Sequence, residues 1–86
     1  MTILFFSADW CGTCKAMYPV WNKIVVENTA FEYESVDCTK DTEKAAQYKV
    51  SQLPTFIAVD SIGTPIDKRQ GFLTLAKFQD WLDSLK

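Results

Sequence analysis

The sequence predicts an α/β fold in which a four-stranded mixed sheet is flanked by three helices. Short apolar or β-branched runs alternate along the chain with stretches of helical periodicity, and no repeat or linker-like segment separates them. The 86 residues are 48% hydrophobic and 23% charged, a normal balance for a chain with one core. We therefore expect a single domain over residues 1–86 with the element order βαβαββα.

The first part of the chain predicts a strand followed by a long helix. Thr2–Ser7 is a short run rich in Ile, Leu and Phe and bounded by polar residues, which favours a buried strand. Between Cys11 and about Asn28, apolar residues recur at helical spacing, and Pro19 inside this pattern should kink the helix. The residues of this stripe are Met17, Val20, Trp21, Ile24 and Val25.

A second strand and a short helix are predicted next. Phe31–Asp37 alternates two sets of side chains, with Phe31, Tyr33 and Ser35 opposite a charged outer side of Glu32, Glu34 and Val36. The strand–helix–strand order implies a right-handed crossover and parallel pairing of the first two strands. Asp41–Lys49 resembles a short helix that turns Ala45, Ala46 and Tyr48 inward.

The last part predicts a hairpin and a closing helix. Thr55–Val59 is β-branched and aromatic, residues 61–64 form a turn at Gly63, and Pro65–Gln70 returns as the antiparallel partner strand. Thr74 is a suitable N-cap for a final helix, whose apolar stripe would be Leu75, Phe78, Leu82 and Leu85.

Charge and composition exclude several functional classes. Nine basic and eleven acidic residues provide no basic face for nucleic acid and no polybasic patch for a membrane. Histidine is absent, which excludes catalysis by a histidine base and imidazole metal sites. No apolar run is long enough for a membrane span, and three cysteines are an odd count for an extracellular disulfide framework. We expect a cytoplasmic, soluble monomer.

The strongest chemical signal is the segment Trp10-Cys11-Gly12-Thr13-Cys14-Lys15, where the first strand gives way to the first helix. This spacing brings two sulfurs within reach of a disulfide. The N–H groups and partial positive charge of the helix N-terminus favour a thiolate at Cys11 and lower its pKa. Cys14, one turn deeper, suits the resolving thiol of a disulfide exchange. A zinc site would need a second Cys pair or histidines, so no metal is expected.

Several further residues give the chain a resemblance to the thioredoxin family. Trp10–Lys15 is similar to the family motif W-C-G-P-C-K except at Thr13, and the similarity continues in order through Pro19, the segment 53–55 (Leu-Pro-Thr), Gly63 and Gly71. The resemblance implies the minimal form of the thioredoxin fold and a thiol–disulfide oxidoreductase that reduces protein disulfides. It needs no cofactor beyond the Cys11–Cys14 disulfide, and a thioredoxin-reductase-type donor would regenerate it.

The resemblance also assigns residues around the cysteines. Pro54 would follow a cis peptide bond and pack against the disulfide, and the backbone of Leu53 would pair with an extended substrate. Trp10, Gly12, Gly71 and Phe72 would form an apolar docking patch around Cys11, although Phe72 equally fits the core. Lys15 is either a charge that favours the thiolate or an ordinary solvated lysine.

The chain departs from the family at several positions. Thr13 replaces a proline and should restore an N–H donor near the Cys11 sulfur, which would raise the reduction potential above the value of about −270 mV typical of thioredoxins. The family's buried aspartate and its neighbouring lysine correspond here to Phe5 and Tyr33, which leaves Asp9, water or the Cys11 thiolate to assist Cys14. The chain begins at the strand before the motif, so Phe31–Asp37 should be a sheet edge. Cys38 is either an ordinary thiol or a site of regulatory oxidation.

Two alternatives remain open at this point. A glutaredoxin-like enzyme coupled to glutathione fits the short length, although the segment around Gly71 lacks paired glycines. An interaction subunit that uses the same fold as a scaffold is the other, and the intact dithiol argues against a purely structural role.

Overall fold

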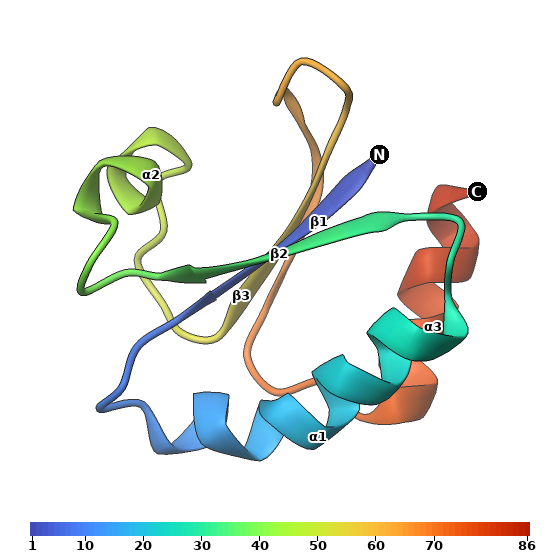
Figure 1. Ribbon diagram of the computed structural model, residues 1–86, viewed down its shortest axis with the longest axis horizontal. Helices are drawn as coiled ribbons and strands as arrows, with labels where there is room; N and C mark the ends of the chain where they lie inside the picture. Colours follow the sequence, from blue (N-terminus) through green and yellow to red (C-terminus); the bar gives the residue numbers. More distant parts are fainter.

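A computed structural model of residues 1–86 has the predicted order of elements (Figure 1). The strands are β1 (Thr2–Ser7), β2 (Glu32–Asp37), β3 (Thr55–Val59) and β4 (Pro65–Gln70). The helices are α1 (Gly12–Glu27), α2 (Thr42–Gln47) and α3 (Leu75–Leu85). No helix is long and apolar enough to cross a membrane.

The four strands form one mixed sheet in the order β2-β1-β3-β4. β1 and β2 are parallel, as the crossover through α1 requires, whereas β3 is antiparallel to both β1 and β4. The sheet places β2 at one edge, which confirms that expectation, and β4 at the other. The central strands β1 and β3 are almost entirely buried because helices cover both of their faces.

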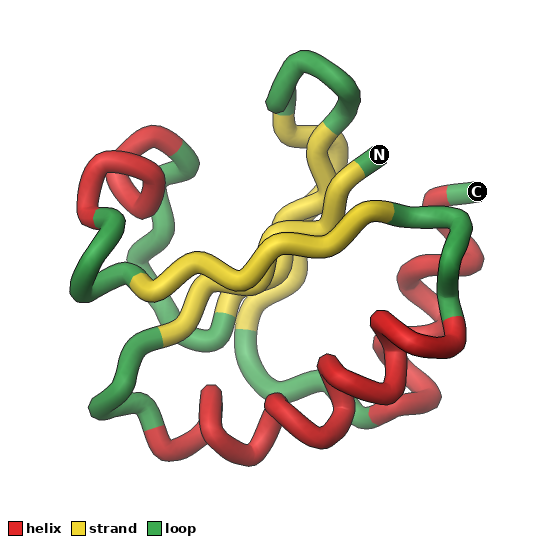
Figure 2. The backbone as a smooth tube through the Cα atoms, in the orientation of Figure 1, coloured by secondary structure: helices red, strands yellow, loops and turns green.

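The helices lie on opposite faces of the sheet (Figure 2). α1 and α3 pack against one face, where Ile3, Phe5 and Phe56 meet Trp21 and Phe78. The segment that contains α2 covers the other face through a smaller core of Leu4, Phe6, Val36, Ile57 and Val59. Successive side chains of β1 point to opposite faces of the sheet, so its odd-numbered apolar residues enter the larger core and its even-numbered apolar residues enter the smaller one.

Several details differ from the sequence-based expectations. Val36 is buried in the smaller core rather than on a charged outer side, because the α2 segment covers that face. Ala46 is exposed, and α2 ends at Gln47 instead of reaching Lys49, which has a positive φ of 55°. Trp81 is buried as well and widens the apolar stripe expected for α3. Phe31 lies just before β2 and joins the larger core.

Candidate active site

Cys11 and Cys14 stand at the N-terminus of α1 and are joined by a disulfide, with their Cα atoms 5.2 Å apart. Cys11 is the N-cap residue, and its sulfur accepts a hydrogen bond from the backbone N–H of Cys14 at 3.1 Å. The Cys11 N–H in turn donates to the carbonyl of Ala8 at 3.1 Å, which closes the turn between β1 and α1. The first sulfur therefore occupies the place where a helix terminus stabilises negative charge.

The two sulfurs differ in access to solvent. Cys14 is completely buried, whereas Cys11 keeps 7% of its surface exposed. Both pack with Ala8 in a small cluster, and Leu53 lies against this cluster. A substrate disulfide can therefore reach the Cys11 sulfur from solvent, whereas the Cys14 sulfur is accessible only from within the site. This order of access suits a nucleophile followed by a resolving thiol.

The sheet register brings Leu53 and Pro54 to the cysteines. The last pair between the antiparallel strands β1 and β3 is Phe6 with Thr55, so the chain leaving β1 and the chain entering β3 meet at the same end of the sheet. The Leu53–Pro54 peptide bond is cis, and the proline side chain is fully buried. Two segments far apart in the sequence thus form one site.

The loop that follows β4 is held next to this site by two hydrogen bonds. The N–H of Gly71 donates to the carbonyl of Pro54 at 2.8 Å, and the N–H of Leu73 reaches the Met17 sulfur on α1 at 3.4 Å. Phe72, between these anchors, is 46% exposed and does not belong to the core. The loop therefore holds an apolar side chain at the surface.

The remaining predicted site residues lie on the surface next to the cysteines in the chain. Trp10 is 74% exposed, and Gly12, Thr13 and Lys15 are exposed as well. The N–H of Thr13 makes no hydrogen bond to the Cys11 sulfur; that donor is the N–H of Cys14. The expectation that a Thr13 N–H stabilises the Cys11 thiolate is therefore not supported by a hydrogen bond in this structure.

Phe5 occupies the position that corresponds to the family's buried aspartate. Phe5 is fully buried in the larger core and stacks on Phe56, with ring centroids 5.0 Å apart. The register places Ser35 directly opposite Phe5 on β2, and Tyr33 opposite Ile3. The Tyr33 hydroxyl donates to the carbonyl of Asn28, and burial raises the pKa of Tyr33. Asp9 is exposed.

Cys38 lies apart from the disulfide. It follows β2, is half-buried, and packs against the smaller core on the α2 side of the sheet. Burial raises the pKa of the Cys38 thiol, and the nearby charges of Asp37 and Asp41 raise it further. No three His, Cys, Asp or Glu side chains gather into a set of metal ligands.

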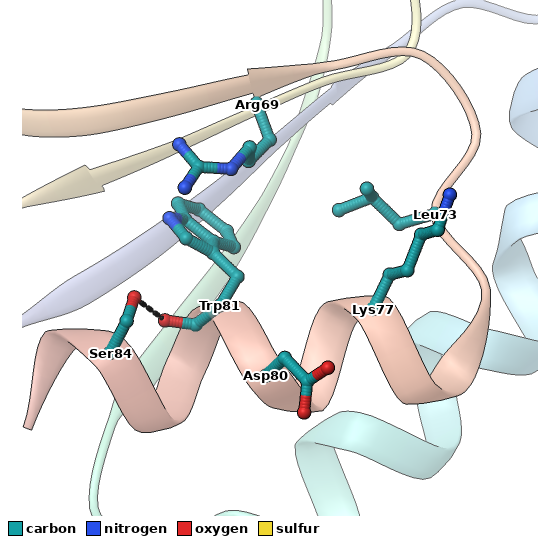
Figure 3. A pocket seen from close by; sticks show the side chains of 6 residues that line it. All are labelled: Arg69, Leu73, Lys77, Asp80, Trp81 and Ser84. Carbon is teal, nitrogen blue, oxygen red and sulfur yellow. Dashed lines mark hydrogen bonds between the residues drawn. The ribbon is translucent and has the colours of Figure 1, made fainter.

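The one cleft in the structure lies between β4 and α3 and does not include the cysteines (Figure 3). It has a volume of about 320 Å³ and is lined by Arg69, Leu73, Lys77, Asp80, Trp81 and Ser84. The Arg69 guanidinium lies over the Trp81 ring, 5.6 Å from its centre. The indole N–H of Trp81 donates to Asp67 at 3.0 Å and, as the main cause, lowers the pKa of that carboxyl.

Comparisons with known proteins agree with this architecture. The family model "Thioredoxin" matches residues 1–84. A thioredoxin of Staphylococcus aureus is 34% identical over 84 residues, which cover 91% of this chain and 75% of the relative. A thioredoxin of Mycoplasmoides gallisepticum is 28% identical over 80 residues, which cover 93% of this chain and 79% of the relative.

Two further matches differ in their coverage. The TPR repeat-containing thioredoxin TDX of Arabidopsis thaliana is 32% identical over 71 residues, but the match spans only 18% of that longer protein. A solved structure that concerns thiol resolution in yeast mitochondrial 1-Cys peroxiredoxin by the glutathione/thioredoxin systems superposes with a TM-score of 0.86. Its matched chain is 23% identical, with 96% of this chain and 76% of that chain covered, so this likeness concerns the fold.

Proposed function

Because this chain belongs to the thioredoxin family and is a thiol–disulfide oxidoreductase, we propose that it reduces disulfides in protein substrates. The observation that carries the proposal is the position of the Cys11–Cys14 pair: Cys11 caps α1, and its sulfur accepts the N–H of Cys14. A thiolate at this place is stabilised before it meets a substrate.

The exchange proceeds in two steps. The Cys11 thiolate attacks one sulfur of the substrate disulfide, forms a mixed disulfide with it, and releases the other substrate sulfur as a thiolate that takes a proton from water. Cys14 then loses its proton and attacks the Cys11 sulfur. The Cys11–Cys14 disulfide forms, the second substrate sulfur leaves as a thiol, and two electrons have passed from the dithiol to the substrate.

Backbone pairing at Leu53 is proposed to hold the substrate. The N–H and C=O of Leu53 make no hydrogen bond within the protein, and its side chain lies against the cysteine cluster. An extended segment of a substrate could take up both groups in the manner of an added strand. Exposed Trp10 and Phe72, with Gly71 beside Pro54, would supply apolar contacts to that segment.

The wider setting forms part of the same proposal. Oxidised protein would be returned to the dithiol by a thioredoxin-reductase-type donor, with no cofactor held by the chain itself. We place this electron transport in the cytoplasm and expect a monomer, with Glu32 and Glu34 on the edge strand β2 opposing pairing between copies.

Reduction of insulin, a protein with accessible disulfides, tests the proposal with three matched serine variants. Cys11→Ser should abolish turnover, and Cys14→Ser should accumulate a covalent mixed disulfide with the substrate, visible by mass spectrometry. Cys38→Ser, the control, should keep at least half of the activity because Cys38 lies outside the cysteine cluster. Turnover that survives Cys11→Ser would overturn the proposal.

A redox titration in glutathione buffers, followed by tryptophan fluorescence, distinguishes the alternatives. A midpoint between about −270 and −240 mV fits a reductase of protein disulfides, whereas about −200 mV or higher favours glutathione-coupled or oxidising work. The absence of a two-electron transition would favour a scaffold.

A further inference from the structure

A pair of hydroxyl groups lies at the junction of β1 and α1. The Oγ atom of Ser7 and the Oη atom of Tyr18 are 3.3 Å apart. Ser7 is buried with 4% of its surface exposed, whereas Tyr18 is 39% exposed. The Tyr18 ring is held edge-on against Phe5, with centroids 5.6 Å apart. The pair therefore connects a buried position with the solvent.

This hydroxyl pair lies on the side of α1 that carries the resolving thiol. Tyr18 follows Cys14 by four residues on α1, and residues with this spacing are neighbours on one face of a helix. Long helical side chains lean toward the N-terminus, so the Tyr18 side chain extends over the turn that holds Cys14. On the sheet side, Ser7 directly precedes Ala8, whose side chain contacts the Cys11 and Cys14 cluster.

The second step of disulfide exchange requires a route for a proton. Cys14 is completely buried and must lose its thiol proton before it can attack. The charged side chains next to the cysteines in the chain, Asp9 and Lys15, are both exposed. The segments 52–54 and 71–74 that pack beside the site carry no titratable group.

The end of β2 also brings titratable groups near Ser7. Asp37 lies opposite Ser7 in the parallel register, but its carboxylate accepts hydrogen bonds from the backbone and hydroxyl of Thr39. The adjoining Cys38 packs toward the other face of the sheet. Its N–H, not its thiol, bonds the Ser7 carbonyl at 2.8 Å.

We propose that the Ser7–Tyr18 hydroxyl pair carries the proton of Cys14 to solvent during resolution of the mixed disulfide. This inference rests on the proposed function. The Cys14 proton passes to the hydroxyl pair, which releases a proton to water at the exposed end of Tyr18. The Cys14 sulfur then bonds to the Cys11 sulfur, and the electron pair of the broken bond leaves on the substrate sulfur, which takes a proton from water.

Stopped-flow reaction of the reduced protein with an aromatic disulfide that releases a coloured thiolate separates the two steps. The first equivalent of colour reports attack by Cys11, and the second reports resolution by Cys14. Tyr18→Phe keeps the ring on Phe5 and removes only the hydroxyl. It should slow the second phase about five- to tenfold at pH 7 and leave the first unchanged. The deficit should shrink as the pH rises, because hydroxide becomes abundant enough to remove the thiol proton without the hydroxyl pair.

Matched variants exclude a merely structural effect. Ser7→Ala should show the same pH-dependent deficit and Ser7→Thr should restore the rate, because threonine returns the hydroxyl. Tyr48→Phe is the control: it removes a hydroxyl that bonds the Gly63 carbonyl, away from the cysteine cluster, and should leave both phases unchanged.

Three results would overturn the proton route. They are an unchanged second phase in Tyr18→Phe, a deficit that does not shrink as the pH rises, or a larger deficit in Asp37→Asn than in Tyr18→Phe. Loss of the first phase in the unmodified protein would instead refute the proposed reductase function.

Discussion

Asn28 and Gln79 bond to each other through both ends of their amide groups. The Asn28 Nδ2 donates to Oε1 of Gln79 at 3.0 Å, and the Gln79 Nε2 donates to Oδ1 of Asn28 at 2.8 Å. Asn28 also donates to the Ile24 carbonyl and accepts the Tyr33 hydroxyl at its own carbonyl. One buried asparagine therefore joins the end of α1 to α3 and β2.

Removing the partner of Asn28 should destabilise the fold. Gln79→Ala leaves the Oδ1 atom of a buried asparagine without its donor, and we expect the free energy of unfolding to fall by about 1–3 kcal/mol in urea titrations. Asp80→Ala, an exposed neighbour on the same helix, is the control and should stay within about 0.5 kcal/mol of the unmodified protein. Equal losses in the two variants would show that the pair is not stabilising.

The hydrogen bond from Trp81 to Asp67 predicts a dependence of stability on pH. The pKa of Asp67 is lowered in the folded protein, so this carboxylate stabilises the fold above its unfolded pKa of about 3.9 and ceases to do so as pH falls through the folded-state pKa. Asp67→Asn should therefore be less stable than the unmodified protein at pH 7, and the difference should narrow below about pH 4. Because the side chain is 38% exposed, the difference should be small.

Urea unfolding at several pH values checks this expectation. Asp80→Asn is the matched control, since Asp80 is exposed and its carboxylate accepts no hydrogen bond in the structure. A stability difference for Asp67→Asn that is constant from pH 7 to pH 3 would contradict the assignment.

Two glycines with the same φ angle allow the cost of backbone strain to be distinguished from the cost of side-chain crowding. Gly63 and Gly71 both have φ of +86°, where a side chain costs about 1–2 kcal/mol. A Cβ atom at Gly71 meets nothing within 4 Å, whereas one at Gly63 would lie 3.3 Å from the Tyr48 hydroxyl oxygen. Gly63→Ala should therefore reduce the free energy of unfolding more than Gly71→Ala.

A double variant tests the source of that excess. Tyr48→Phe removes the hydroxyl oxygen that a Cβ atom at residue 63 would approach. In that background, the loss of unfolding free energy caused by Gly63→Ala should approach the loss caused by Gly71→Ala, as measured by thermal or urea unfolding. If the excess persists without the hydroxyl, the crowding explanation is wrong.

The Cys38 thiol should react slowly with alkylating reagents at neutral pH. Burial and the charges of Asp37 and Asp41 raise its pKa, so little thiolate is present at pH 7. In a protein that also carries Cys11→Ser and Cys14→Ser, Asp41→Asn should speed alkylation of Cys38 by iodoacetamide about twofold, and less in high salt. Asparagine still caps α2, so the helix is retained.

Glu43→Gln serves as the control for that experiment. It removes a negative charge from the first turn of α2, and this charge is not among the causes of the Cys38 shift. Its alkylation rate should match the parent, and a rate equal to that of Asp41→Asn would refute a specific effect of Asp41.

The regular elements could be predicted because their patterns are local. The bounds of β1, β3 and β4 match the predicted runs, since each is a short run bounded by turn or polar residues. The cap of α3 at Thr74 was likewise confirmed, with its hydroxyl accepting the Lys77 N–H. Trp81 lies three residues after Phe78, a helical spacing that could have revealed it as core.

Features that depend on tertiary contacts escaped prediction. The burial of Val36 depends on where the α2 segment lies, which the alternation along β2 does not specify. The Ser7–Tyr18 pair joins a strand end to a helix across eleven residues, and no local motif marks it. At the site, the spacing of Cys11 and Cys14 predicted the disulfide, whereas the role of Leu53 was inferred only from the family resemblance.

The meeting of the Ala8–Cys14 turn with Leu53 has a consequence for biosynthesis. The ribosome makes Cys11 and Cys14 some forty residues before Leu53, and β1 cannot pair with β3 until that later segment emerges. During this interval the nascent polypeptide carries the dithiol without Leu53, whose side chain lies against the cysteine cluster in the folded protein. The complete site therefore assembles late in translation, and a product truncated before Leu53 would carry both thiols without the segment that packs beside them.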